Sequence, residues 1–322
     1  MSITLVAAGD DEGRRLDRIL RKALRDLPLS AIHRLIRQGS VQIDGKPATA
    51  SLRIQKGQSI IINLAEPLIY APLIKKSIKI SVTLEIIYEN QGLIIINKPS
   101  GIPVHGGKGI KSESLETLVR SYLEPKIPPS LSFRPGPLHR LDTNSSGLIA
   151  FSTNLEGARL FSQLMKDRRI KKTYLTIVEG KIKKAEIWQD ELIRDDGEKR
   201  SFASQESSSK TAITRIKPIA GNETYTLIQA DIETGRTHQI RAQAASRGHP
   251  LFGDKKYGAR LIRPACGKST TFLLHAFRME FPPPLPAMIE APLPNRFKTA
   301  IVELFGKDTL DLPVFYGLKV KV

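Results

Sequence analysis

The sequence has a single cysteine, Cys266, in 322 residues. An intramolecular disulfide and a multi-cysteine zinc site are therefore excluded, and a reducing compartment is the simplest expectation. No apolar run approaches the roughly 20 residues that a membrane-spanning helix needs, and the mildly apolar residues 3–8 are too few for the core of a secretory signal. We therefore expect a cytoplasmic protein without a membrane segment.

Acidic residues are also scarce, with 32 Asp and Glu against 50 Lys and Arg, a formal net charge of +18. An excess of this size indicates a polyanionic partner, either a nucleic acid or an anionic membrane surface. A charge that only keeps the protein in solution is the alternative. With 40% hydrophobic residues, the chain can form one large domain, or an ordinary domain with a small module beside it.

Residues 14–27 predict an amphipathic helix, with Asp10 or Asp11 as its N-cap. Its apolar residues recur at steps of three and four, at Leu16, Ile19, Leu20, Ala23, Leu24 and Leu27. The opposite face is basic and consists of Arg14, Arg15, Arg18, Arg21, Lys22 and Arg25. This is more positive charge than solubility alone requires, and we expect it to bind phosphates.

A second helix is predicted from Ser30, as its N-cap, to Gly39, followed by a small hairpin and a strand at residues 59–64. The segment 14–64 resembles the S4 RNA-binding domain in Arg15-Leu16-Asp17, in Arg34-Leu35-Ile36 and in residues 39–45. The resemblance implies RNA contacts for Arg15, Arg18, Arg34 and Arg37. A short helical cap with a solvated basic face is the alternative.

Residues 65–82 contain two prolines and no clear period, so they predict a linker between domains. Strands and helices do not alternate regularly over residues 83–300, which favours an α+β domain around a mainly antiparallel sheet. The expected strands are 84–88, 93–97, 148–152, 173–178 and 225–232, and the expected helices 114–123, 155–168 and 237–247. Residues 301–322 show no interpretable pattern and are taken as a C-terminal tail.

Three polar segments are candidates for chemistry. The loop 139–147 places Asp142 just before the predicted strand 148–152, and a rigid strand can hold a carboxylate in position. Taken alone, this loop is equally good turn chemistry. The segment 234–241 uses a glycine turn to bring Arg236, His238 and Arg241 to a helix start, and the segment 171–175 contains Tyr174.

These three segments, together with Asn97-Lys98-Pro99-Ser100-Gly101 and Val104-His105, resemble the motifs of the RluA-type pseudouridine synthases over about residues 83–295. The loop at His105 and the segment 194–210 are most similar to the RluC-type enzymes, which modify large-subunit ribosomal RNA. Ser145 stands where that family usually has Thr, and serine keeps the hydroxyl group.

The resemblance implies an isomerase that converts uridines of structured RNA, such as 23S-type ribosomal RNA, into pseudouridine. It assigns the central carboxylate to Asp142, as nucleophile on the ribose or as base at its 2′ position, and the ion-pair partner to Arg241. Tyr174 would stack on the uracil or help to move a proton, and Arg140 would fill the gap left by the extruded base. We expect no cofactor, no metal and no obligatory protein partner, and a monomer would suffice.

Other functions fit the sequence less well. A non-catalytic RNA-binding or ribosome-assembly factor with the same fold is the main alternative, and an S4-containing methyltransferase would need a Gly-rich cofactor loop that we do not find. Gly267-Lys268-Ser269 is no phosphate loop, because Ile262 stands where a second glycine is required. The histidines are too scattered to predict a metal site. Lys98 is expected to form a turn beside the pocket and to have no catalytic role. The sequence does not predict which uridine is modified.

Overall fold

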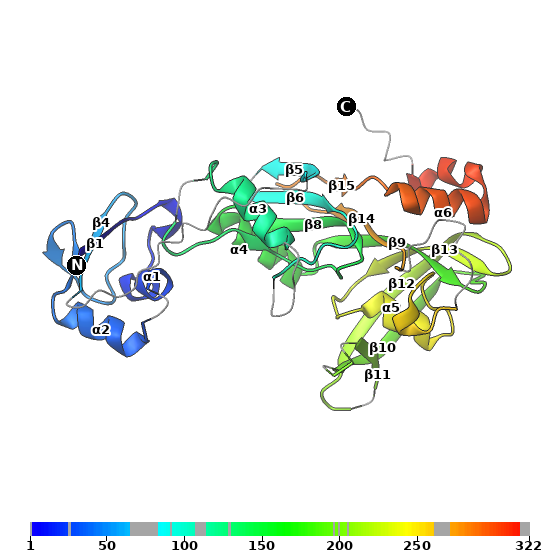
Figure 1. Cartoon of the computed structure of the whole chain (residues 1–322), viewed down its shortest axis with the longest axis horizontal. Coiled ribbons are helices and arrows are strands. Elements are labelled where there is room, and N and C mark those ends of the chain that lie inside the picture. The colour runs from blue at the N-terminus through cyan, green and yellow to red at the C-terminus, as the bar shows by residue number, and fades with distance from the viewer. Residues whose placement is uncertain are drawn as a thin grey trace. The chain divides into compact units, whose positions relative to one another are not determined.

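A computed structural model describes residues 2–24, 27–64, 83–90, 92–106, 114–127, 130–195, 197–198, 200–204, 206–260 and 271–315. The predicted linker 65–82, Cys266 and the rejected phosphate loop at 267–269 lie outside these residues. The chain divides into two compact units (Figure 1). The first contains Met1–Thr83, Thr117–Gly136 and Ser152–Leu160, and the second contains Leu84–Glu116, Pro137–Phe151 and Phe161–Val322.

The first unit contains a four-stranded sheet in the order β1-β4-β2-β3 together with two helices. The elements are β1 (Ser2–Val6), α1 (Leu16–Ala23), α2 (Leu29–Arg37), β2 (Val41–Ile43), β3 (Lys46–Pro47) and β4 (Ser59–Asn63). Leu16, Ile19, Leu20, Ile32 and Ile36 are buried in the core beneath the sheet, so the predicted apolar faces are the ones that pack. The helix–helix–hairpin prediction is confirmed, and β1 adds a strand that was not predicted.

Both predicted N-caps in this unit are wrong. Ser30 lies inside α2, whose N-cap residue is Pro28. The first N–H groups of α1 are satisfied instead by backbone carbonyls, since Leu16 N donates to Leu52 O at 2.8 Å and Asp17 N to Ala50 O at 3.1 Å. Asp11 belongs to the short 3-10 turn η1 (Gly9–Asp11) and is fully buried. Its carboxylate accepts N–H groups of this unit from Ala8, Leu131 and Ser132.

The second unit is built on an 11-stranded sheet in the order β11-β10-β12-β13-β9-β14-β8-β6-β5, with β15 paired to β14 and β7 to β8. The strands are β5 (Ile86–Asn90), β6 (Leu93–Lys98), β7 (Gly136–Pro137), β8 (Ser146–Ser152), β9 (Lys171–Glu179), β10 (Glu186–Asp195), β11 (Arg200–Ala203), β12 (Lys210–Gly221), β13 (Tyr225–Ile232), β14 (Leu274–Glu280) and β15 (Met288–Glu290). The described pairings are antiparallel apart from β14 with β8. The α+β prediction with a mainly antiparallel sheet is therefore confirmed.

The remaining helices are α3 (Leu115–Leu123), α4 (Leu155–Lys166), α5 (Gln239–Ser246) and α6 (Asn295–Phe305), with the short turns η2 (Lys255–Tyr257) and η3 (Lys307–Asp311). The helices α5 and α6 belong to the second unit, whereas most of α3 and the first half of α4 belong to the first. The start of the segment taken as a tail is ordered, because α6 continues past residue 300 and η3 follows it. Phe297, Ile301 and Phe315 are buried in one cluster with Leu175 and Phe277 of the sheet. The sequence pattern gave no indication of these elements at residues 301–315. The domain boundaries themselves stay predictions.

Candidate active site

Asp142 and Arg241, 99 residues apart in the chain, meet at an ion pair. Asp142 lies on the loop directly before β8, and Arg241 lies on the first turns of α5. Arg241 Nη1 donates to Asp142 Oδ2 at 3.0 Å, and the Asp142 side chain keeps 16% of its surface exposed. The structure thus brings together the carboxylate and the guanidinium that the sequence singled out.

Arg241 is held from its other side by Asp254, which was not predicted from the sequence. Nε and Nη2 of Arg241 donate to the two Asp254 oxygens at 2.7 and 2.9 Å, a bidentate pair in which both residues are buried. The guanidinium also packs over the rings of Phe272 and Tyr257, at 4.1 and 4.8 Å from their centroids. Burial opposes the charge of Arg241, but the hydrogen bonds and charges of Asp254 and Asp142 outweigh it and raise the Arg241 pKa.

Lys98 is fully buried beneath the Asp142 loop, which shows more than the simple turn predicted for it. Its Nζ donates to the backbone oxygens of Pro99, Ile102 and Thr143 at 2.9, 2.8 and 2.9 Å. Burial lowers the pKa of Lys98 to about 7, and the charge of Asp142 acts in the opposite direction. These carbonyls offer an acceptor to each proton of an ammonium group, so Lys98 fixes the residue next to Asp142.

The loop 139–147, which carries Asp142, is also held at its two ends, His139 and Gly147. His139 Nε2 accepts the N–H of Ala150 at 3.0 Å, and its ring stacks on Phe161. Burial, followed by the charge of Lys172, lowers the pKa of His139 to about 3, so the imidazole is neutral and can accept this bond. Gly147 has φ +103°, and a Cβ there would lie 2.2 Å from the Ala276 carbonyl oxygen, so only glycine allows β14 this close.

Tyr174 of β9 lies within electrostatic range of Asp142, and His238, at the start of α5, lies beside it. Burial, and then the negative charge of Asp142, raises the pKa of Tyr174 well above its ordinary value, so the phenol is neutral. His238 Nε2 lies 3.8 Å from Asp142 Oδ1, and its Nδ1 is 3.0 Å from the Tyr257 hydroxyl oxygen. Burial lowers the pKa of His238, against the opposing effect of Asp142.

A cavity of about 360 Å³ opens over the ion pair. Asp142, Arg241, His238 and the exposed Arg140 line it, together with Thr143, Asn144, Gly253, Asp254, Lys255, Lys256, Thr271 and Phe272. Tyr174 is not among the lining residues. The cavity therefore presents the carboxylates of Asp142 and Asp254, both paired with Arg241, and several further cations, which suits an anionic substrate held close to a reactive carboxylate.

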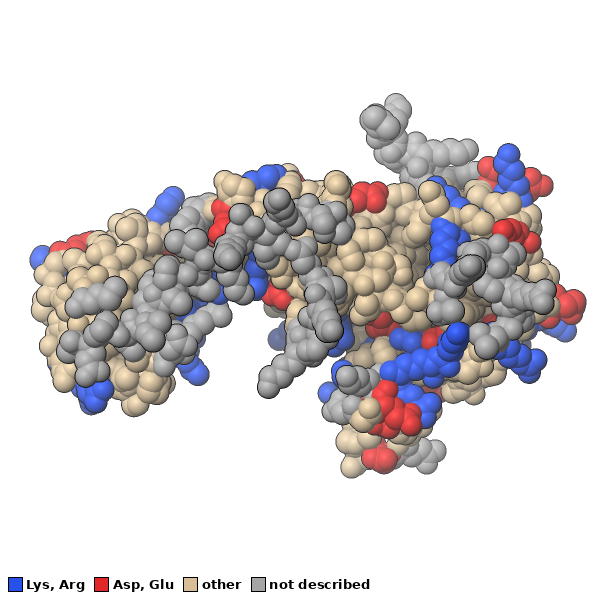
Figure 2. All heavy atoms as spheres, viewed as in Figure 1, with Lys and Arg blue, Asp and Glu red and all other residues tan. Residues whose placement is uncertain are grey.

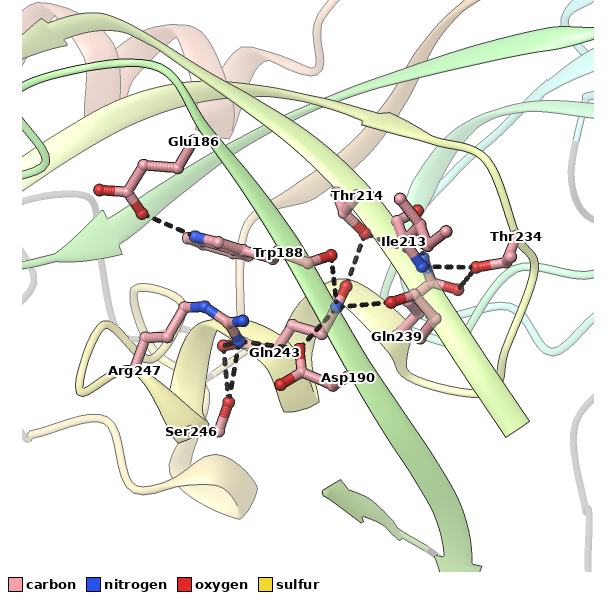
Figure 3. A network of polar contacts seen from close by, with 11 residues as sticks. Glu186, Trp188, Asp190, Ile213, Thr214, Thr234, Gln239, Gln243, Ser246 and Arg247 are labelled. Carbon is pink, nitrogen blue, oxygen red and sulfur yellow. Dashed lines mark hydrogen bonds and ion pairs between the residues drawn. The ribbon is translucent and has the colours of Figure 1, made fainter. Parts of the chain in front are cut away.

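Two buried glutamines fix α5 and the Arg241 it carries (Figure 3). Gln243 is 0% exposed, contacts Trp188 O, Ala212 O and Asp190 Oδ2 through Nε2, and accepts the Thr214 hydroxyl at 2.6 Å. Gln239, one turn earlier, accepts the Thr234 hydroxyl and the Arg236 N–H, and donates to Ile213 O and Thr214 Oγ1. The helix is thereby attached to β10, to β12 and to the loop 234–236.

The arginines predicted to bind RNA lie on the first unit. Arg18, Arg34 and Arg37 are exposed on α1 and α2, while Arg15, the residue before α1, forms an ion pair with Asp17 at 2.9 Å. Figure 2 shows blue Lys and Arg side chains on this module and on the second unit. These arginines belong to the first compact unit, and Asp142 belongs to the second.

Within the described residues, no three His, Cys, Asp or Glu side chains are grouped as a metal ion would require. In the same part of the chain, no helix is long and apolar enough to cross a membrane.

Two family models match the chain: that of RNA pseudouridylate synthase over residues 92–246 and that of the S4 domain over residues 14–60. The ribosomal large subunit pseudouridine synthase C of Vibrio parahaemolyticus is 30% identical over 92% of this chain and 94% of its own length. An uncharacterized RNA pseudouridine synthase of Bacillus subtilis, YlyB, is 28% identical over 94% of this chain and 98% of its own. The solved structure of human RNA pseudouridylate synthase domain containing 1 shares the fold, with a TM-score of 0.53 and 23% identity over 67% of this chain and 84% of that one.

Proposed function

Because this chain belongs to the RNA pseudouridylate synthase family and is an isomerase of that type, we propose that it converts specific uridines of large-subunit ribosomal RNA to pseudouridine, with Asp142 as the acting carboxylate. The observation that carries the proposal is the Asp142–Arg241–Asp254 arrangement in the cavity. The choice of RNA rests on the relatives named as synthases of the ribosomal large subunit.

The reaction places defined demands on the site. The bond between ribose C1′ and uracil N1 must break, the uracil must turn while it stays bound, a bond from C1′ to C5 must form, and the C5 proton must leave while N1 gains one. An ionised Asp142 can attack C1′ and later be displaced by C5, or it can remove the 2′ proton; both routes remain open. No net oxidation occurs and no second reactant is consumed, so a cofactor is not needed.

Arg241 supports the carboxylate of Asp142 as its ion-pair partner. The guanidinium donates a charge-assisted hydrogen bond to Asp142 Oδ2 at 3.0 Å and so fixes the orientation of the carboxylate in the cavity. Asp254 binds the other edge of Arg241 and so fixes the direction in which the guanidinium faces Asp142. We therefore propose Arg241 as ion-pair partner and Asp254 as the residue that positions Arg241.

Tyr174 and Arg140 have narrower proposed roles. A neutral phenol can stack on uracil or donate a proton, but it cannot act as a phenolate base at ordinary pH. Arg140 is exposed at the cavity, where it can occupy the space that an extruded uridine leaves in its RNA. The RNA phosphates would be bound by the arginines of the first unit, Arg15, Arg18, Arg34 and Arg37. We expect the enzyme to act in the cytoplasm and to need no obligatory protein partner.

The test is pseudouridine mapping of ribosomal RNA, naked and in assembling particles, after incubation with the pure protein and no added cofactor. Asp142→Asn removes the reactive oxygen charge and should abolish turnover while RNA binding stays nearly intact. Asp167→Asn, an exposed position outside the cavity, serves as the matched control. New pseudouridine from the wild type and the control, but not from Asp142→Asn, would support the proposal. RNA binding without any product would favour the ribosome-assembly factor instead.

A further inference from the structure

A second and larger cavity, of about 660 Å³, lies in the same unit and shares no lining residue with the cavity at Asp142. Its wall is formed by β9, β12, β13 and β14, by the end of α4 and the chain after it (165–170), and by the loop 233–236. Seven of its lining residues are Lys or Arg and three are Asp or Glu: Lys166, Arg168, Lys171, Lys172, Arg215, Arg236 and Arg278, against Asp231, Glu233 and Glu280.

Lys172 is the unusual member of this set. Only 8% of its surface is exposed, yet within the described chain its ammonium group has no acid within ion-pair distance and no hydrogen-bond acceptor. A Cβ added at Gly235 would lie 3.9 Å from Lys172 Nζ, so the ammonium lies next to the glycine turn of loop 234–236. The aliphatic part of the side chain is buried while Nζ opens to the cavity, where a bound anion would supply the missing counter-charge. Burial lowers the Lys172 pKa to about 8, in agreement with this missing partner.

The acids of the cavity are already engaged. Glu280 pairs with Lys171 at 3.6 Å and Glu233 with Arg215 at 2.6 Å, while Asp231 accepts the Thr173 hydroxyl and the Gln229 amide. Arg278 pairs with Glu290, outside the cavity wall. Four lining cations have no acidic partner in the described residues, namely Lys166, Arg168, Lys172 and Arg236. The cavity thus carries an uncompensated positive charge.

The cavity is adjacent to the proposed active site. Gly235 and Arg236 line it, and two residues later His238 lines the cavity at Asp142, so one loop borders both. On β9, Lys172 and Tyr174 are two residues apart and therefore lie on the same face of the strand. A ligand bound at Lys172 would be close to one bound at Asp142.

We propose that this cavity binds a backbone phosphate of the RNA strand next to the target uridine, with Lys172 and Arg236 as its cationic ligands. The inference rests on the proposed RNA substrate of the neighbouring site. Arg236 donates Nε to Thr211 O, which holds its guanidinium at the cavity and leaves the outer nitrogens for an anion. A strand fits better than a free phosphate ion, since the unpaired cations Lys166 and Arg168 continue the positive charge beyond Lys172.

The experiment measures RNA binding rather than turnover, so that it stays informative if the isomerase proposal fails. The full-length protein binds a large-subunit ribosomal RNA transcript lightly ethylated on its phosphates, and bound and free RNA are compared position by position. Affinity for the unmodified transcript is measured across a salt series. Two variants change the proposed ligands: Lys172→Met, and Arg236→Gln, whose exposed side chain can be replaced without disturbing the hydrophobic core. The control is Lys183→Met, an exposed lysine outside both cavities.

With the wild type and Lys183→Met, ethylation should interfere at one or two linkages; with Lys172→Met and with Arg236→Gln this interference should disappear. For each of these two variants, the affinity for the unmodified transcript should fall about tenfold. The slope of log affinity against log salt concentration should decrease in magnitude by about 0.7 to 0.9, the value for a single phosphate interaction. Unchanged interference and slope in both variants would refute the proposal. Inorganic phosphate that raises the unfolding temperature of the wild type but not of Lys172→Met, with RNA binding unchanged, would assign the cavity to a free anion instead.

Discussion

Asp254→Asn tests whether the position of Arg241 depends on the bidentate pair behind it. The substitution keeps the size of the side chain and replaces a charged acceptor of two hydrogen bonds, at 2.7 and 2.9 Å, by an amide that can accept only through its oxygen. Asp254 and Arg241 are 2% and 5% exposed, so water solvates the broken pair poorly. The Arg241 guanidinium should then turn towards Asp142, its remaining carboxylate.

The expected loss of stability follows from the burial of the pair. Removing one partner of a buried ion pair costs about 3 to 5 kcal/mol, and we expect about 3 because the amide oxygen retains one bond. For a domain of this size each kcal/mol corresponds to about 2 to 4 °C, so the unfolding temperature should fall by about 6 to 12 °C. A displacement of about 1 Å at a catalytic group costs about a hundredfold in rate, which sets the expected loss in kcat.

The assay combines thermal unfolding with single-turnover pseudouridine formation at a temperature where the variant is folded. Asp167→Asn is the control, because among the described residues its exposed carboxylate accepts only from Gln163. A variant that unfolds about 6 °C earlier but keeps kcat within twofold of the wild type would show that Asp254 stabilises the fold without positioning Arg241. Unchanged values of both quantities would refute the whole argument.

The other predictions concern RNA binding, helix anchoring and acid stability. Replacing Arg34 and Arg37 by Gln should weaken RNA binding and lower the salt slope by about 1.4 to 1.8, with no change in unfolding temperature; unchanged binding at low and high salt would remove the RNA role of the N-terminal module. Gln243→Leu leaves buried polar partners unpaired and should cost about 2 to 4 kcal/mol of unfolding free energy by urea titration, whereas a loss below 1 would show that the network contributes little. His275 is fully buried, and burial lowers its pKa to about 4. Its stabilising contribution is therefore complete above pH 6.5 and decreases as the pH falls towards 4, by about 2 kcal/mol at pH 5, and His275→Gln should lose less stability than the wild type between pH 7 and 5.

Where the sequence pattern is regular, it predicted the elements well. The alternating residues 225–232 form β13 with the expected bounds, and the helix expected at 114–123 is α3 to within one residue. The strand β10 was missed because its inward positions 186, 188, 190 and 192 include Glu186 and Asp190, which removes the apolar alternation. Glu186 is needed there as acceptor of the Trp188 indole N–H, and Asp190 as partner of Gln243 and Arg247.

The strand β14 was missed for the opposite reason. Five of its seven residues are buried, on both faces of the strand, so no alternation marks it. The helix α6 was not predicted either, although its buried residues Phe297, Ala300 and Ile301 are spaced by three and four. In both cases the secondary structure of a short apolar segment depends on the elements that pack against it, and the local sequence pattern does not show those elements.

The sequence by itself determined the class of the protein: its charge indicates a polyanion, its periodicity predicts the two modules, and its motifs place Asp142, Tyr174 and Arg241 in a known family. Only the tertiary structure decided how these residues are held. No sequence motif predicted the roles of Asp254 and Lys98 in holding Arg241 and the Asp142 loop. The position of Lys172 next to the loop 234–236, without an acidic partner, is likewise visible only in the folded chain. The physical reason is that an ion pair, a buried ammonium or a missing counter-charge depends on distances of a few ångströms between segments far apart in the chain.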